Sequence, residues 1–536
     1  MKNKIGTEKI GNIYLFLIFG IFPLFFHNFY YDIYQTKYYF FVITTILMAF
    51  VAVLFCDVDF GQLFSKMQKE GMIWYISFLL FAGISAMLSS HGKEAFTGSA
   101  GRYNGFLIYA VYAVAFLILF QTKEITTELF VVLEISGILA GILGILNHYS
   151  IDPFGFTKGL DITPNFMSTL GNTGCFVEFM VMIAAVSGTL YVKEKKTVHS
   201  IWHIAVYCIS CAALILAGPE AAYIGLFVFL IVVVFAVEKR GERFRFWALI
   251  ICPDIILLLL CLVKRINPKF AQHQKYIGSV TVYLLSHVRL LLLSLLVMCG
   301  IVMMLWIFTF KLHAREQKNR KKIYLMILVC LAVMFSVIFF SVNMGWINGF
   351  SALKIDDDWG TSRGYIWRIA GEYYSSLPVW QKLIGIGPDT MYFAFESMNA
   401  RVAETAIDNA HNLVLQMLIT HGIFGLASYL GFVISSIRIC VKKASENKMY
   451  YILLTSVISF YAAAMPGVNM ISSSAVAMLL LGLIRCSFSG EELSIGKGRK
   501  MSAITLIMIA FLLLLFAFKI VLQVDGTAMM NEMLAG

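Results

Sequence analysis

Runs of about 20 apolar residues, the length that crosses a lipid bilayer as a helix, recur along almost the whole chain. Because a bilayer holds no water to bond an open backbone, only helices or closed barrels can span it. Hydrophobic residues make up 60% of the 536 residues and charged residues only 14%, which excludes an ordinary soluble domain. We therefore predict an all-α, polytopic membrane protein of about 12–15 transmembrane helices, with one long extracytoplasmic loop between late spans. The candidate spans centre near Ile18, Leu47, Leu79, Ala113, Gly137, Val181, Ser210, Phe227, Ile255, Leu296, Leu331, Leu426, Ser456, Leu480 and Leu513.

The basic residues predict how these helices are oriented. With the N-terminus in the cytoplasm, nearly every inner loop carries Lys or Arg, as the positive-inside rule requires. The inner-loop residues are Lys66 and Lys69; Lys193, Lys195 and Lys196; Lys239, Arg240, Arg243 and Arg245; Lys311 to Lys322; Arg438, Lys442, Lys443 and Lys448; and Lys497, Arg499 and Lys500. One outer loop breaks the rule, and its residues are Lys264, Arg265, Lys269 and Lys275. The net charge of +11 therefore reflects membrane orientation, and we expect the lipid bilayer, not nucleic acid, as a partner.

This orientation divides the chain into three parts. Residues 1–343 are predicted to form N-terminal transmembrane helices, and residues 411–536 the C-terminal ones. Residues 344–410 are predicted to form a large extracytoplasmic loop, which would face neither ATP nor nucleotide sugars.

The ten cysteines lie almost all inside apolar runs, and none falls in the long polar loop. The CxxC pair Cys208 and Cys211 is buried in an apolar span and has no second pair to complete a zinc site. We therefore expect no disulfide framework, no metal site and no cofactor.

The longest polar interval runs from Asp356 to Gly425 and has hydrophobic helices on both sides. Irregular polar backbone between membrane spans needs water or protein partners that lipid cannot supply, so this interval is the predicted place for chemistry.

Arg363 is the first candidate site residue in this interval. Ser362 is a plausible N-cap for a helix from Arg363 towards Tyr374, and a helix N-terminus that carries an arginine can bind an anion. Spacing alone favours the alternative of an ordinary capped helix with a solvated arginine. Arg368 lies about 140° further round such a helix, where Glu372 at i+4 makes an ion pair the better interpretation.

His411 is the second candidate. It follows Asp408 by three residues and precedes an apolar helix from Asn412 to Ile419. A histidine at the membrane boundary, with a carboxylate one turn back, suits a general base that deprotonates a hydroxyl. The residues alone favour equally a histidine that caps the helix or bonds a loop carbonyl.

Two other motifs in the interval are weaker indications of ligand binding. The acidic run from Asp356 to Asp358 resembles a DxD metal motif, but a solvated turn is expected where no nucleotide sugar is present. The sequence from Gly385 to Pro388 is a turn, and a lone Gly-x-Gly is weak evidence for phosphate binding.

Taken together, these segments resemble the O-antigen ligase/polymerase superfamily. The resemblance rests on an arginine near a tryptophan, a Gly-x-Gly-Pro turn, and an outer His-Asn that enters a helix ending Gly-Ile-x-Gly. The corresponding residues are Arg363 and Trp367; Gly385 to Pro388; His411 and Asn412; and Gly422 to Gly425. Upstream, Ser168 to Asn172 and Gly101 to Gly105 are similar to earlier elements of the family.

The resemblance implies a GT-C-like, helical membrane glycosyltransferase in the bacterial cell (inner or cytoplasmic) membrane. Such enzymes move a glycan from a polyprenyl-diphosphate carrier to an acceptor glycan, lipid or protein, on the outer face, with inversion and without a metal. It implies His411 and Arg363 as catalytic residues. We expect the diphosphate or glycan to be contacted by Arg102, Lys264, Arg265, Arg368 and Asn412.

One departure from the family pattern concerns its usual Ser-Arg pair at the outer start of a span. Here the chain has Pro219 and Glu220 instead. Lys264 or Arg265 could supply the missing charge, which is the interpretation we prefer; Arg102 could supply it; or the protein could bind the carrier lipid without full activity.

Two alternatives remain open from the sequence. The same chemistry could serve an oligosaccharyltransferase that modifies protein. A non-catalytic flippase or transporter of lipid-linked glycans is the rival from another class, although its cavity should place basic residues deep inside several spans, whereas Lys and Arg here stay mostly near span ends.

Overall fold

The structure is a computed structural model. It describes residues 7–30, 32–55, 72–99, 101–121, 125–156, 168–266, 279–287, 340–346, 356–402, 405–467 and 470–486, with the single positions 289, 292, 296, 337 and 354. The predicted spans near Leu331 and Leu513, nearly all of the span near Leu296, and the basic residues Lys269, Lys275 and Lys311 to Lys322 lie outside the described residues.

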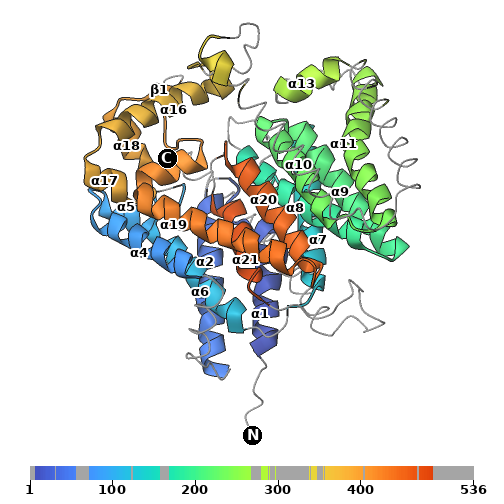
Figure 1. Ribbon diagram of the computed structural model, residues 1–536, viewed down its shortest axis with the longest axis horizontal. Coiled ribbons are helices and arrows are strands. Elements are labelled where there is room, and N and C mark those ends of the chain that lie inside the picture. Colours follow the sequence, from blue (N-terminus) through green and yellow to red (C-terminus); the bar gives the residue numbers. More distant parts are fainter. Residues whose placement is uncertain are drawn as a thin grey trace, which may run out of the picture.

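The described chain is almost entirely helical (Figure 1). The first half contains α1 (Thr7–Phe16), η1 (Leu17–Ile21), η2 (Phe22–Leu24), α2 (Ile33–Phe55), α4 (Ile73–Met87), α5 (Gly92–Thr97), α6 (Phe106–Gln121), α7 (Glu128–His148), α8 (Thr173–Lys193), α9 (Thr197–Ala217), α10 (Glu220–Val233), η3 (Val234–Ala236) and α11 (Arg240–Ile266). The second half contains α13 (Ser279–Ser286), α16 (Trp359–Ser376), α17 (Val379–Ile384), α18 (Met391–Ser397), α19 (Leu413–Lys443), α20 (Met449–Ala464) and α21 (Ile471–Leu483). The strands β1 (Arg401–Val402) and β2 (Thr405–Ala406) form a short antiparallel hairpin.

These helices confirm the predicted class of an all-α, polytopic membrane protein. Six described helices are long and apolar enough to cross a membrane, and six shorter apolar helices accompany them. Twelve of the predicted span centres fall within these twelve segments. Large apolar side chains are exposed on the outside of the protein. Those of α2 include Ile43, Leu47 and Phe50, as expected of side chains that contact lipid.

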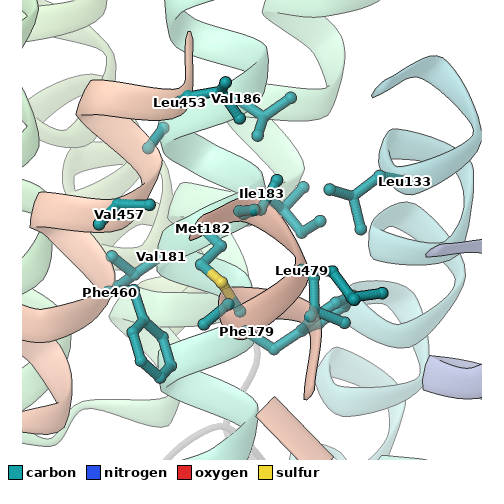
Figure 2. Close-up of a cluster of buried hydrophobic side chains, with 14 of the residues drawn as sticks. Leu133, Phe179, Val181, Met182, Ile183, Val186, Leu453, Val457, Phe460 and Leu479 are labelled. Carbon is teal, nitrogen blue, oxygen red and sulfur yellow. The ribbon is translucent and has the colours of Figure 1, made fainter. Parts of the chain in front are cut away.

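Helix α8 is the centre of the core. Of its most apolar 18-residue window, 94% is buried inside the protein. Figure 2 shows Phe179 and Ile183 of α8 among side chains from three neighbours, including Leu133 of α7, Val457 of α20 and Leu479 of α21. A helix that is apolar all round and enclosed on every side fixes the positions of the helices that pack against it.

Helix α19 is broken one third of the way along. Gly422 has φ 69° and ψ −179°, which interrupts the helical hydrogen bonds. The carbonyls of Ile419 and Thr420 instead accept the backbone N–H groups of Ile386 and Gly387, at 3.1 and 3.0 Å. A Cβ on Gly385 would lie 2.3 Å from the Thr420 carbonyl oxygen, so this close approach needs glycine. The predicted turn at Gly385 is therefore a docking element for the broken helix.

The polar interval is more regular than a loop, since it contains α16, α17, α18 and the hairpin. Figure 1 shows these elements over one end of the helices, opposite to the start of α1. The expected N-cap at Ser362 is wrong: α16 begins earlier, with Asp358 at its N-cap, and Ser362 lies inside it with φ 65°. Gly360 and Ser362 both have positive φ, so the first turn of α16 is irregular.

The two ends of the helices carry different charge patterns. At the end away from α16, Lys193 is enclosed and lies 3.3 Å from both Glu238 and Glu242, while its Nζ sits over the Tyr451 ring. The basic residues assigned from the sequence to three inner loops therefore meet at one end of the helices. The pKa of Lys448 is lowered there, mostly by burial and also by the charges of Lys195, Lys239 and Lys193. This clustering supports the predicted alternation of the spans.

The orientation of the chain in the membrane can be tested by thiol labelling. Ser397 lies on α18, and Lys195 lies in the connection between α8 and α9; both are exposed. If the α16–α18 end faces the outside, a membrane-impermeant thiol reagent should label Ser397→Cys in intact cells and label Lys195→Cys only after lysis. The native cysteines are the background control, and the reverse labelling pattern would invert the topology.

Candidate active site

Arg102 lies in a turn between α5 and α6, on the same end of the helices as α16. Its Nε and Nη2 donate to the two carboxylate oxygens of Asp408, at 2.9 and 2.5 Å. Asp389 stabilises this turn, because its Oδ2 accepts the backbone N–H groups of Ser99 and Asn104, at 2.7 and 3.0 Å. A bidentate ion pair thus holds the Arg102 side chain, and two backbone bonds hold the turn on which it lies.

Arg363 lies in the first turns of α16. Its Nη1 donates to the carbonyl of Gly360 at 2.8 Å and lies 4.0 Å from a carboxylate oxygen of Glu220, at the start of α10. Its Nε is buried and has no hydrogen-bond partner among the described residues. Glu220, which stands where the sequence comparison expected an arginine, is therefore a neighbour of Arg363, and Nε of Arg363 is a buried donor without a partner among the described residues.

His411 lies between the polar interval and α19, with φ 46°. Its backbone N–H donates to Oδ1 of Asn409 at 2.7 Å, and Asn412 caps α19 by accepting the Leu415 N–H at 3.1 Å. Trp367 of α16 donates to the carbonyl of Ala410 at 3.1 Å. The histidine is thus not the helix cap, and its turn is tied to both flanking helices.

The two arginines act electrostatically on the histidine. Burial first, then the charges of Arg363 and Arg102, together lower the pKa of His411 to about 4, while Asp408 opposes them. Asp408, the carboxylate that the sequence placed one turn before His411, pairs with Arg102. Tyr103, Ser362 and His411 all have positive φ, an uncommon state for side chains other than glycine that is frequent at functional sites. The structure therefore brings together Arg102, Arg363 and His411 from three distant parts of the chain.

A polar cavity of about 30 Å³ lies beside the His411 turn. Its lining residues are Asn104, Tyr109, Asp389, Asn409, Asn412, Leu413, Gln416, Met417, Thr420, His421 and Gly467. Sequence reasoning missed Asp389, Gln416 and His421. Asp389 follows the Gly-x-Gly-Pro turn directly, a signal that could have singled it out.

The other predicted contacts have different surroundings. Arg368 pairs with Asp357 at 2.7 Å and with Glu372 at 2.9 Å, on the exposed side of α16, in agreement with an ion pair. Lys264 and Arg265 end α11, which Figure 1 shows on the far side of α10 from α16. Among the described residues neither of them makes an ion pair. Arg102, by contrast, is close enough to His411 to lower the pKa of that histidine.

The acidic run from Asp356 to Asp358 has no metal-binding geometry in the described part of the chain. Asp357 is committed to Arg368, whose guanidinium lowers the pKa of that carboxyl below its usual range. Elsewhere among the described residues, no three His, Cys, Asp or Glu side chains are grouped so that they could hold a metal ion.

The fold and site define a class of protein: a multi-pass membrane protein with two arginines and a histidine gathered at one end of its helices. The family model described as O-antigen ligase matches residues 276–430, the segment that carries Arg363, the Gly-x-Gly-Pro turn and His411. This match confirms the resemblance to the O-antigen ligase/polymerase superfamily and indicates a membrane protein that processes lipid-linked glycans. No curated protein matches the chain.

Asp389 should make the stability of the protein depend on pH. Its pKa is raised from 3.8 to about 7, chiefly by burial and also by Asp408, although the backbone bonds from Asn104 and Ser99 and the charge of Arg102 oppose the rise. Between these values the folded state binds a proton that the unfolded state lacks, so the free energy of unfolding falls as pH rises. Asp389→Asn should remove this dependence.

The measurement is the thermal unfolding midpoint in detergent at pH 5 and pH 8. The native protein should lose more stability over this step than Asp389→Asn, and Asp357→Asn is the control on an exposed carboxyl. Equal losses in the native protein and Asp389→Asn would show that Asp389 does not titrate in this range.

Proposed function

We propose that the protein is an outer-face membrane glycosyltransferase of the polysaccharide polymerase or ligase type. It transfers a glycan from a polyprenyl-diphosphate carrier to an acceptor hydroxyl, with inversion and without a metal. The observation that carries the proposal is the convergence of Arg102 and Arg363 on His411, whose pKa both arginines lower.

The arginines suit a diphosphate leaving group. When the bond from the anomeric carbon to the phosphate oxygen breaks, the electron pair leaves with the diphosphate, and negative charge develops there. Guanidinium donors can stabilise this charge where other enzymes use a metal. Arg363 has an unpaired, buried Nε for this purpose, and Arg102 is held rigidly by Asp408.

His411 suits the acceptor side of the reaction. With its pKa near 4, the imidazole is neutral at physiological pH and can accept the proton of an acceptor hydroxyl as its oxygen bonds to the anomeric carbon. A bound diphosphate would cancel part of the arginine charge that depresses this pKa. The histidine therefore becomes a stronger base when the donor is in place, which couples deprotonation of the acceptor to donor binding.

The transporter alternative would need charged groups inside the spans that are available to bind a substrate and are not already bonded to other protein groups. The enclosed Lys37 donates to three backbone carbonyls, those of Phe22, Pro23 and Phe25, at 2.8 to 3.1 Å. Glu134 is paired with His203 and Trp202, both at 2.8 Å. Both groups stabilise helix breaks or helix contacts, so they favour a structural role over a transport pathway.

Substitutions of the two central residues test the proposed function. Arg363→Ala should lower the rate about 10²–10³-fold, as loss of one charge-stabilising donor does. Arg363→Lys should rescue little, because a point charge does not reproduce the guanidinium fork. His411→Ala should lower the rate roughly 10²–10⁴-fold while the carrier lipid still binds.

The assay is glycan polymer length on a gel, in the presence of EDTA, with native lipid-linked glycan extracted from producing cells. Arg368→Ala is the matched control, since this arginine serves two carboxylates on the exposed side of α16. Wild-type polymer from both Arg363→Ala and His411→Ala would reject this active site, and complete loss of activity in EDTA would reject the metal-free mechanism.

Glu220 should compete with the donor for Arg363. Its carboxylate lies 4.0 Å from the guanidinium, so an incoming diphosphate has to displace it. Because a partly exposed ion pair is worth about 0.2–1 kcal/mol, Glu220→Gln should lower the KM for the carrier by a factor of about 1.4 to 5. Glu372→Gln, which removes one of the two carboxylate partners of Arg368, is the matched control. A marked fall in kcat for Glu220→Gln would mean that the carboxylate takes part in the reaction.

A further inference from the structure

His421 is a second histidine next to the site, and the proposed reaction does not use it. It is 2% exposed, and its ring lies face to face with Phe78 and edge-on to Tyr109. Its Nδ1 lies 2.8 Å from the Thr420 hydroxyl, whereas its buried Nε2 has no hydrogen-bond partner among the described residues. A buried polar atom without a partner costs free energy, so it points to a missing ligand.

The neighbouring bonds fix which nitrogen carries the proton. The Thr420 hydroxyl donates its single hydrogen to the Gln416 carbonyl at 2.7 Å. Its lone pair must then accept from Nδ1–H of His421. Nε2 is therefore a bare acceptor, and it needs a donor from the cavity that His421 lines.

The rest of the cavity offers complementary groups. Oδ1 of Asn409 and Oε1 of Gln416 already accept backbone N–H groups, those of His411 at 2.7 Å and Ala410 at 3.0 Å. Their amide NH2 groups remain as donors, and Asp389 is another lining residue of the same cavity. A volume of about 30 Å³ is room enough for a water molecule, which needs two to four polar partners.

We propose that this cavity binds a structural water that links His421 to Asp389 and so fixes the His411 turn relative to the Arg102 turn. Asp389 holds the backbone of Ser99 and Asn104, on both sides of Arg102. Gln416 and Asn409 hold the backbone of Ala410 and His411. The water joins these two sets of bonds, so His421 is a positioning residue for the base and for one of the diphosphate-binding arginines.

The inference rests on the proposed function for its effect on rate, and two substitutions of the same residue test it. In His421→Gln the side-chain carbonyl reaches the place of Nε2 and can accept from the water. In His421→Asn it reaches only the place of Nδ1. Both variants lose the same ring contacts, so they share any cost in stability. His421→Gln should retain most of the turnover, and His421→Asn should lose roughly ten- to a hundredfold in kcat with an unchanged KM for the carrier, because a small misplacement of reacting groups is that costly.

Thr420→Val is a second, nearly isosteric variant. It removes the acceptor that holds the proton on Nδ1, and should lower kcat in the same way as His421→Asn. Unfolding midpoints in detergent, and binding of a polyprenyl diphosphate without glycan in nanodiscs, monitor folding and the donor site. Equal kcat values for His421→Gln and His421→Asn, whether high or low, would overturn the proposal.

A readout that is independent of activity separates this proposal from the proposed function. A high-resolution cryo-EM map of the wild-type protein should show ordered density within hydrogen-bond distance of Nε2 of His421 and of the Asp389 carboxyl. A dry cavity at that resolution overturns the water site even if the protein is an active transferase. Ordered water in a protein without transferase activity would reject the proposed function alone.

Discussion

The site depends on the hydrogen bonds that the backbone carbonyls of α19 accept where this helix is broken. A helix that breaks inside a membrane protein releases carbonyls that lipid cannot bond, so another part of the chain must supply donors. The N–H groups of Ile386 and Gly387 do so, and the Ser85 hydroxyl adds a third bond, to the Thr420 carbonyl at 2.9 Å. Because the same turn leads directly into Asp389, the backbone of the break also determines where the Arg102 turn is held.

Electrostatics within the site follow from this arrangement. Arg102 is neutralised by Asp408 and Arg363 approaches Glu220, yet both cations still lower the pKa of His411. The protein therefore holds positive charge next to a neutral base before any ligand arrives. In the proposed reaction, binding of the anionic carrier would relieve the repulsion that keeps the imidazole weakly basic.

The departure from the family pattern at Glu220 has a local explanation. A carboxylate at the first residue of α10 suits the helix N-terminus, where negative charge is stabilising. It also gives Arg363 a partner in the absence of substrate. The proposed consequence is weaker donor binding without loss of the catalytic groups.

The sequence by itself determined the class of fold, because apolar length and the need to satisfy the backbone leave a polytopic helical protein as the outcome. It also determined Arg363, His411 and Arg102 as candidates, and the pairing of Arg368 with Glu372, which needs only helical periodicity. It misplaced the start of α16, because positive φ at Gly360 and Ser362 is not encoded by a capping pattern. Only the tertiary structure decided that Asp408 serves Arg102, that Glu220 meets Arg363, and that Asp389 and His421 line one cavity. The members of these pairs are about 30 to 300 residues apart in the chain, and their meeting depends on how helices pack, which no local spacing records.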